Sequence, residues 1–249
     1  MKVELSPLEQ VARTRLCLAL DGIENVDGAL SLADELNGYV GTFKVGKELH
    51  TAAGMEGRNI VKELRERGMR TFLDLKFHDT PATVYSASKV ASVPGVYMFN
   101  VHVAGGEAMC KKAMEAVKNI GSGRPKVIGV TVLTSLDNDD LSTLGYGYQF
   151  DTLVKRNTAL AQKWGLDGIV CPANKAGDLA KEFGNNFLYV TPGISYSGKQ
   201  GEGQKQIYTP DLAVRDCKNS ILVIGSAITK AVDRKTTAYE ILQSMAKNL

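Results

Sequence analysis

Short apolar and β-branched runs alternate with longer amphipathic segments along the whole chain. The apolar runs number eight and lie at residues 15–20, 42–45, 70–75, 97–103, 126–133, 168–171, 187–191 and 221–224. Each run is almost continuously apolar, which is typical of strands buried on both faces of a parallel sheet. Alternating strands and helices favour right-handed βα units, and eight units predict a closed (β/α)8 TIM barrel of the α/β class.

Helical patterns fill the gaps between these runs. Ser6, Pro7 and Glu9 predict a short helix before the first strand, with Ser6 as its cap and Glu9 completing a capping box. Further amphipathic stretches lie at residues 56–67, 107–119, 151–164 and 236–249. We expect residues 1–249 to form a single barrel domain. An open doubly wound sheet is the alternative, but the chain lacks Gly-x-Gly-x-x-Gly after its first strand, which favours the barrel.

The composition of the chain gives no sign of a nucleic-acid-binding protein or a membrane protein. A formal net charge of +3 gives no argument for binding nucleic acid or an anionic membrane. Apolar runs stay shorter than the roughly 18 residues of a transmembrane helix, and the N-terminus lacks a signal-peptide core. We expect a cytoplasmic protein whose scattered cysteines are reduced, mostly buried thiols, with a metal or disulfide set as the alternative; these cysteines are Cys17, Cys110, Cys171 and Cys217.

Charged side chains gather at the ends of the first three predicted strands. These side chains are Asp21, Lys44, Asp74, Lys76 and Asp79. Barrel enzymes carry their chemistry at the C-terminal ends of the strands. Strand alternation places Asp74 and Lys76 on one face, where opposite charges favour each other's ionised forms. Helix caps or surface salt bridges would explain one or two such residues, whereas five on three adjacent strand ends predict a site.

Polar residues also follow the later strands. The fourth run contains Asn100 and His102, and the fifth leads to Thr134 and Ser135. The seventh and eighth strand ends are rich in glycine: Pro192-Gly193, then Gly198, Gly201 and Gly203, then Gly225-Ser226. Barrels often bind phosphate here through backbone N–H groups, so we expect a phosphate site with residues 195–207 as a candidate lid. Glycines that only serve turns are the alternative.

The block Phe-Leu-Asp-Leu-Lys-Phe-His-Asp at residues 72–79 resembles the orotidine 5′-monophosphate decarboxylase family and is highly specific. Shorter matches support the resemblance at residues 20–21, 43–46, 101–102, 133–135, 191–194 and 224–225. The resemblance implies cofactor-independent decarboxylation of orotidine 5′-monophosphate to uridine 5′-monophosphate, a step of pyrimidine biosynthesis. It also implies a homodimer and no metal.

The resemblance further implies a role for each matching residue. Lys76 would protonate C6 of the pyrimidine, and Asp74 would lie near the substrate carboxylate and hold Lys76 charged. Lys44 would hydrogen-bond to Asp74 and the ribose. Asp79 would belong to the site of the neighbouring subunit. The remaining implied contacts are Asp21 with the ribose hydroxyls, Thr80 with the ribose across the interface, Ser135 with the pyrimidine amide, Gln204 with base and phosphate, and Pro192, Gly225 and Ser226 with the substrate.

Two positions depart from the family pattern. Relatives usually carry arginine directly after the glycine of the eighth strand, where this chain has Ser226, and many bacterial relatives carry arginine in place of Ser195. Arginine binds a phosphodianion through two hydrogen bonds, whereas serine donates one. Lys199, Lys205 and Lys230 are candidates for the missing charge. The interpretations are a rearranged phosphate contact, a weak or engineered enzyme, or a repurposed site.

Two alternatives from other classes stay open at this point. Sugar-phosphate decarboxylases and aldolases of the same superfamily share Asp-x-Lys-x-x-Asp, but they use a divalent metal and normally place glutamate where this chain has Lys44. A catalytically weak nucleotide-binding barrel is suggested by Ser226. The longer match over residues 77–81 and the complete set of charged residues favour the orotidylate decarboxylases.

Overall fold

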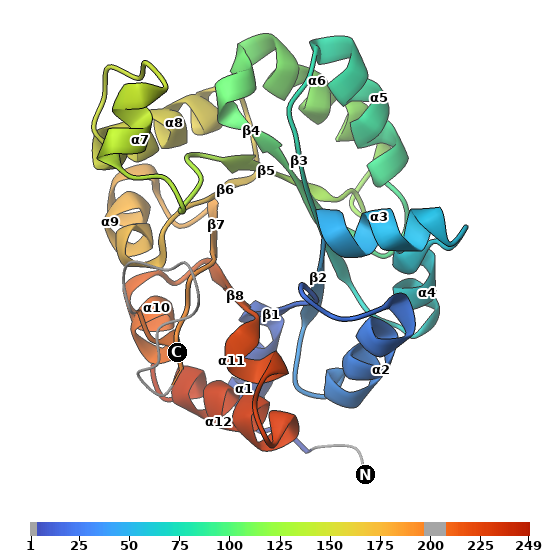
Figure 1. The fold of residues 1–249 in the computed structure, drawn as a ribbon. Coiled ribbons are helices and arrows are strands. Elements are labelled where there is room, and N and C mark those ends of the chain that lie inside the picture. Colours follow the sequence, from blue (N-terminus) through green and yellow to red (C-terminus); the bar gives the residue numbers. More distant parts are fainter. Residues whose placement is uncertain (1–3, 197–207) are drawn as a thin grey trace.

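Eight parallel strands close into a barrel in the order of the chain, with the last strand paired to the first (Figure 1). The computed structural model describes residues 4–196 and 208–249. The strands are β1 Leu16–Ala19, β2 Thr42–Gly46, β3 Thr71–Phe77, β4 Val96–His102, β5 Lys126–Val130, β6 Gly168–Val170, β7 Leu188–Thr191 and β8 Ser220–Ile224. The predicted TIM barrel is therefore confirmed, and the open sheet is excluded.

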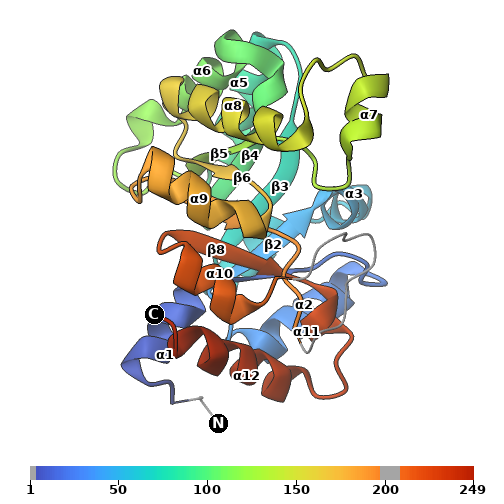
Figure 2. The ribbon, with the colours of Figure 1, turned by 90° about the vertical axis from the view of Figure 1, so that its left-hand side faces the viewer.

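Helices surround this barrel on its outer side (Figures 1 and 2). In the described residues they are α1 Pro7–Arg15, α2 Val26–Leu36, α3 Lys47–Met55, α4 Ile60–Glu66, α5 Pro81–Ala91, α6 Gly106–Val117, α7 Asn138–Thr143, α8 Phe150–Lys163, α9 Ala173–Phe183, α10 Pro210–Asp216, α11 Ser226–Thr229 and α12 Arg234–Ala246. The first and last of them, α1 and α12, pack side by side although they come from opposite ends of the chain.

Two apolar cores, one inside the barrel and one between the barrel and the helices, explain why the strand sequences are almost continuously apolar. Alternate side chains point into the barrel and out toward the helices, as Phe72 and Leu73 do on β3. The inner core includes Met98, Ile128 and Val190, all of them buried. Burying one such side chain contributes about 1.5–3 kcal/mol. Side chains therefore fill the interior of the barrel, and a ligand can bind only at its open mouth.

The predicted start of α1 is confirmed, and its far end helps to close the barrel. The Ser6 side chain accepts a hydrogen bond from the Glu9 backbone, and the Glu9 carboxylate accepts one from the Ser6 backbone. At the other end the buried Arg15 donates to the backbone oxygens of Cys217 and Ser220. Burial lowers the pKa of Arg15 to about 10. Arg15 therefore ties β1 to the segment that leads into β8.

One predicted helix begins later than expected. The amphipathic pattern predicts a helix at residues 56–67, whereas α4 begins at Ile60. The helix before it, α3, was not predicted. Gly57 with φ 68° lies between them, and the Asn59 side chain caps α4 by accepting from the Lys62 backbone N–H. The local cap therefore overrides the longer amphipathic pattern. Other boundaries differ by a few residues, as expected for helix ends.

The cysteines are as predicted, because all four are buried and free. Burial raises the pKa of Cys217 to about 11 and that of Cys110 to about 12, so both thiols stay protonated near neutral pH. Within residues 4–196 and 208–249, none of the helices combines the length and the apolar character needed to cross a bilayer.

Gly168 on β6 provides a test of the barrel packing. A Cβ atom there would press on the carbonyl oxygen of Leu188 and lie 2.7 Å from the Leu188 Cβ. We expect Gly168→Ala to lower the free energy of unfolding by about 1–3 kcal/mol, because backbone on the neighbouring strand cannot move aside. Gly123→Ala is the matched control, since no atom lies within 4 Å of its added Cβ. Equal urea midpoints for the two variants would contradict this account of the packing.

Candidate active site

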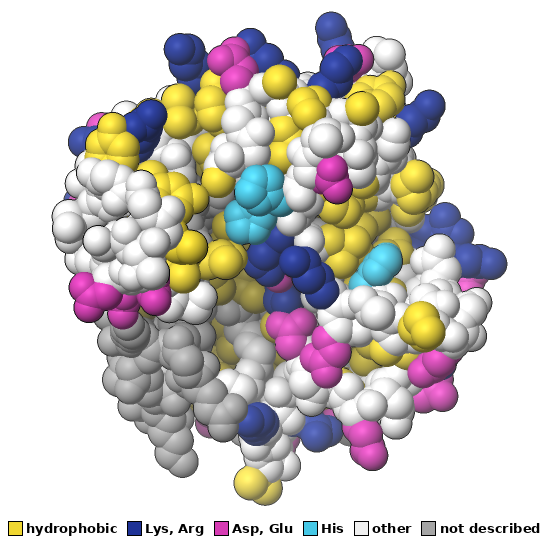
Figure 3. All heavy atoms as spheres, turned by 45° about the horizontal axis from the view of Figure 1, so that its top comes forward, with side chains coloured by type: hydrophobic (Ala, Val, Ile, Leu, Met, Phe, Trp, Pro, Cys, Tyr) yellow, Lys and Arg dark blue, Asp and Glu magenta, His cyan; other side chains and the backbone are white. Residues whose placement is uncertain are grey.

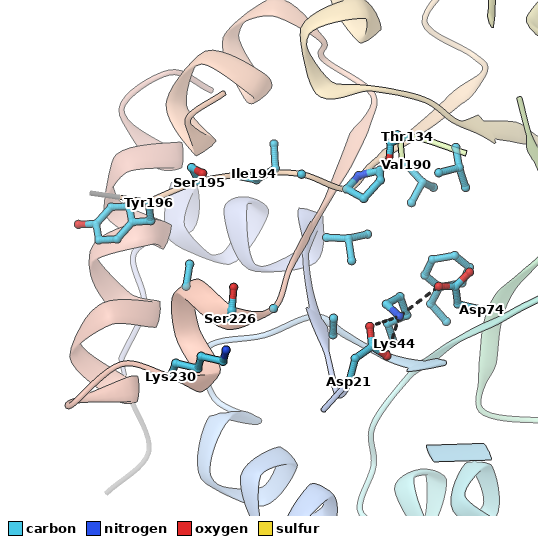
Figure 4. A pocket seen from close by; sticks show the side chains of 18 of the residues that line it. Asp21, Lys44, Asp74, Thr134, Val190, Ile194, Ser195, Tyr196, Ser226 and Lys230 are labelled. Carbon is cyan, nitrogen blue, oxygen red and sulfur yellow. Dashed lines mark hydrogen bonds and ion pairs between the residues drawn. The ribbon is translucent and has the colours of Figure 1, made fainter. Parts of the chain in front are cut away.

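Four charged side chains form a continuous series of ion pairs at the mouth of the barrel. Lys44 Nζ lies 2.6 Å from Asp21 Oδ2 and 3.1 Å from Asp74 Oδ2. Lys76 Nζ lies 2.8 Å from Asp74 Oδ1. Figure 4 shows Lys44 between the two carboxylates. The structure therefore brings together four of the five charged residues that the strand ends predict, Asp21, Lys44, Asp74 and Lys76, as an alternating array.

The centre of this array is buried, so the charges of Lys44 and Asp74 interact strongly. The side chains of Lys44 and Asp74 are 9% and 10% exposed, whereas that of Asp21 is 49% exposed. Burial raises the pKa of Asp74, but the charges of Lys44 and Lys76 outweigh this effect and hold it below its ordinary value. Burial likewise lowers the pKa of Lys44, and Asp74 and Asp21 more than reverse this. Both groups are therefore ionised near neutral pH.

Asn100 positions Asp74 and Lys76 from the neighbouring strand. Its side-chain amide donates to Asp74 Oδ1 at 2.6 Å, and its oxygen accepts from the Lys76 backbone N–H at 2.7 Å. The β3–β4 register shifts between Leu73 and Phe77, and Lys76 in this irregular stretch has φ 51°. Asn100 is recognisable in the sequence as a polar residue near a strand end, but the sequence alone predicts no role for it. The signal was a polar amide inside an otherwise apolar run.

Gly46 is a second residue whose role the sequence analysis missed. It ends β2 and pairs in register with Asp74. A Cβ atom at this position would lie 2.5 Å from Asp21 Oδ1 and 3.3 Å from Lys44 Nζ. Glycine is therefore needed here because any side chain would push Asp21 away from Lys44. Its place two residues after Lys44 was the available signal.

A cavity of about 790 Å³ extends from this array across the mouth of the barrel. Its floor is apolar and belongs to the inner core: Ala19, Phe72, Val130, Val170, Val190 and Val223. The same face is hollowed, with charged side chains of both signs meeting beside histidines (Figure 3). An apolar floor strengthens the electrostatic interactions of a bound ligand, because little water remains to screen them.

The opposite end of the cavity lies at β7 and β8. Pro192, Gly225 and Ser226, which are predicted from the sequence to contact the substrate, line this end of the cavity. Lys230 lies at the same end (Figure 4). Glu240 also lines the cavity. The Tyr196 hydroxyl donates to Glu240 Oε2 at 3.1 Å. Three residues that the sequence analysis named for this region, Lys199, Gln204 and Lys205, fall outside the described part of the chain, as does most of the candidate lid.

Three other predicted residues do not line the cavity of their own chain. Asp79 and Thr80 are exposed, and the Asp79 carboxylate accepts from the Thr80 backbone N–H at 2.6 Å. The Thr80 side chain caps α5 by accepting from the Thr83 backbone N–H. Ser135 is exposed next to Thr134, and Thr134 lines the cavity instead. One chain alone therefore assembles the array without Asp79.

Comparison with known proteins identifies the family. The model of the "Orotidine 5'-phosphate decarboxylase / HUMPS family" matches residues 14–241, which is most of the chain. The chain belongs to this family. A protein of Aliivibrio fischeri (strain MJ11) named orotidine 5'-phosphate decarboxylase is 42% identical over 235 residues, covering 94% of this chain and 98% of the relative. The equally named protein of Shigella flexneri is 40% identical and covers 96% and 95%.

A solved structure of the same family has the same architecture. The crystal structure of orotidine 5'-phosphate decarboxylase from Lactobacillus acidophilus aligns with a TM-score of 0.80 at 31% identity. The alignment covers 92% of this chain and 98% of that one. Sequence resemblance and barrel topology thus agree over nearly the whole chain, and the predicted family is confirmed.

Two histidines lie next to Lys76 on the rim of the barrel. The rings of His78 and His102 face each other with centroids 5.2 Å apart. Burial lowers the pKa of His102, and the nearby charges of His78, Lys76 and Lys47 lower it further, to about 4. His102 is therefore neutral near neutral pH. Among the described residues, no group of three or more His, Cys, Asp and Glu side chains is arranged to hold a metal ion.

The low pKa of His102 predicts a pH-dependent stability. Between pH 6.5 and about 4 the unfolded chain binds a proton at His102 that the folded chain does not, so stability falls as the pH falls through this range. We expect His102→Gln to reduce this slope by at most about 1.4 kcal/mol per pH unit. Urea unfolding of both proteins at pH 7 and pH 5 measures the difference. Identical pH dependence in the two proteins would show that His102 titrates normally.

Proposed function

We propose that this chain converts orotidine 5′-monophosphate to uridine 5′-monophosphate without an organic cofactor, with Lys76 protonating C6 of the pyrimidine. Relatives that share 40–42% identity with almost the whole chain are decarboxylases, and this chain is a decarboxylase, a carbon–carbon lyase. The observation that supports the specific reaction is the array of Asp21, Lys44, Asp74 and Lys76 beside an apolar cavity.

The proposed reaction requires a fixed positive charge near C6, and the array can supply one. Loss of CO2 from orotidylate leaves a vinylic carbanion at C6, with no carbonyl placed to delocalise the electron pair. A fixed ammonium group near C6 stabilises that charge as it develops and then gives it a proton. Lysine suits this step because it can release a proton, whereas arginine stays protonated. Lys76 is held 2.8 Å from Asp74 before substrate binds, so little reorganisation is needed.

Asp74 and Lys44 complete the reacting end of the site in this proposal. Asp74 keeps the ammonium of Lys76 in place, and its own charge repels the substrate carboxylate until CO2 leaves. Lys44 is paired with both Asp21 and Asp74 and can donate to a ribose hydroxyl, while the half-exposed Asp21 can accept from one. Binding energy from the far, phosphate-carrying end of the substrate supports the chemical step. Ser135 and Gln204 remain proposed contacts of the pyrimidine and phosphate.

We also propose that the active unit is a homodimer in which Asp79 and Thr80 reach the partner's site. Both residues are exposed and lie outside the cavity of their own chain. Next to them, β3 and α5 border an apolar groove of about 840 Å³ that includes Leu75, Phe77 and Val90, and Val90 is 77% exposed. A continuous apolar groove of this size is suited to burial against another protein surface. A second copy placed on it by a two-fold axis would bury it in both chains.

We place this enzyme in the cytoplasm. All four cysteines are free. In an oxidising compartment, a protein would be expected to use some of its cysteines in disulfides. Their burial protects the thiols from oxidation, which is compatible with a reducing environment.

Lys76→Ala tests the proposed reaction. We expect the parent chain to consume orotidylate in a spectroscopic assay, with EDTA present throughout, because no metal takes part in the proposal. The variant should lose at least about a thousandfold in kcat while still binding uridine 5′-monophosphate. Lys181→Ala, an exposed lysine of α9, is the matched control and should retain full activity. No turnover by the parent, or unchanged turnover by Lys76→Ala, would contradict the proposal.

Mixing two inactive variants tests the shared site. If Asp79 acts across the interface, Lys76→Ala and Asp79→Ala are each inactive, but their heterodimer contains one intact site. Equal mixing and subunit exchange should therefore restore about a quarter of the parent activity, since half of the dimers are mixed. A mixture of Lys76→Ala with Asp74→Ala is the control and should stay inactive, because both residues belong to one chain's site. Absence of recovery in the first mixture would refute the shared site.

A further inference from the structure

The pairing of β3 with β4 is interrupted by a bulge that includes Lys76. Regular pairing stops after Leu73 and resumes at Phe77, whereas the same interval of β4 contains one residue, Asn100. The residues of β3 in this interval form what we call the β3 bulge, and they are Asp74, Leu75 and Lys76. Extra residues bend a strand and redirect its side chains, and here the backbone of Lys76 turns to φ 51°.

Asn100 holds only part of the β3 bulge. Its side-chain oxygen accepts from the Lys76 backbone N–H at 2.7 Å, and its amide donates to Asp74 Oδ1. Both contacts lie before the point at which pairing with β4 resumes. Lysine seldom adopts a left-handed backbone, so the surrounding structure must hold it there. Contacts beyond Lys76 are therefore needed to fix the end of the bulge.

Two pairs of rings lie where the strands rejoin. The rings of Phe77 and Phe99 pack in the core between the barrel and the helices, with centroids 5.9 Å apart. His78 and His102 directly follow the facing residues Phe77 and Val101, and their rings lie 5.2 Å apart at an angle of 32°. Because successive strand residues point to opposite faces, the two ring pairs hold the rejoined strands from both sides.

The surroundings of the two histidines suit close packing of their rings. Gly105 ends the short 3₁₀ turn η1 Val103–Gly105 that follows β4. A Cβ atom at Gly105 would lie 3.1 Å from His78 Cδ2 and would press on the Met109 side chain, so glycine lets the turn approach the ring. Burial lowers the pKa of His102 to about 4, so the rings meet near neutral pH without repulsion between two cations.

We infer that His78 and His102 are positioning residues for Lys76. Their packed rings hold the end of the β3 bulge and thereby keep the Lys76 ammonium beside Asp74. Neither histidine is among the described residues that line the cavity, so both act through Lys76 and not on a ligand. The catalytic part of this inference rests on the proposed function, in which Lys76 protonates C6. Misplacing such a group by about 1 Å can cost about a hundredfold in rate.

Hydrogen exchange of the Lys76 backbone amide, followed by NMR, tests the positioning without any turnover. His102→Ala removes one ring of the pair and should speed exchange of this amide by about tenfold, because the bulge opens more often. His102→Phe keeps an aromatic ring and should exchange as the parent does. The amide of Cys171, which donates to the Val190 carbonyl in another part of the barrel, should be unchanged in both variants.

Kinetics of the same variants separate positioning of Lys76 from substrate binding. His102→Ala should lower kcat by about tenfold to a hundredfold, with the dissociation constant of uridine 5′-monophosphate within about twofold of the parent. His102→Phe should keep most of kcat. Tyr39→Ala is the matched control: it removes one ring of the pair with Tyr239, whose centroids lie 6.4 Å apart, and Tyr39 does not line the cavity. It should lower stability but leave kcat and exchange of the Lys76 amide unchanged.

Unchanged exchange of the Lys76 amide in His102→Ala would overturn the inference. Equal acceleration at Cys171 would also overturn it, because it would indicate a general loss of stability, as would a loss of kcat in His102→Phe as large as in His102→Ala. If His102→Ala does not fold, His78→Ala removes the same pair from the other strand and is judged by the same results. A parent that consumes no orotidylate, with exchange as expected, refutes only the proposed reaction.

Discussion

The site depends on one carboxylate, Asp74, held between the ammonium groups of Lys44 and Lys76. A buried carboxylate alone would be protonated, and a buried ammonium group alone would lose its proton. Together they stay ionised, because each charge offsets the cost of removing the other from water. Asp21 forms a further ion pair with Lys44. Removal of one member would leave an uncompensated charge near the core. The array therefore requires all of its members at once.

The backbone around Asp74 is shaped to serve this arrangement. Lys76 adopts a left-handed conformation that lysine seldom takes, which costs of order 1–3 kcal/mol. Asn100 fixes that conformation by accepting from the Lys76 backbone and donating to Asp74. On the other side, Gly46 leaves room for Asp21 to reach Lys44. Local strain is thus located where the chemistry is proposed, and the regular strand pairing of the barrel surrounds it.

The fold could be predicted from the sequence because its signal is repeated in every βα unit. Continuous apolar runs mark strands covered on both faces, and eight of them match the closed barrel. The charged residues at the strand ends could be predicted for the same reason. The irregular pairing that turns Lys76 could not, since strand alternation assumes regular geometry. Nor could the role of Asn100, because it depends on contacts between neighbouring strands. The start of α4 was placed too early because a single cap at Asn59 outweighed the pattern.

The two ends of the cavity follow different physical rules. The end at Asp74 is buried, fully paired and fixed by backbone and amide contacts, so it suits charge development in one geometry. The end at Ser226 is more exposed, so water screens the charges there more strongly. This division separates the groups proposed to act on the pyrimidine from those proposed to hold the substrate.

The two lysines keep Asp74 ionised in spite of its burial. A carbon-13 NMR titration of its side-chain carboxyl carbon, assigned by the loss of that signal in Asp74→Asn, measures this directly. The account predicts a pKa below the ordinary 3.8. A carboxyl group that titrates above that value would show that burial outweighs the lysines, and it would contradict the array as the basis of the site.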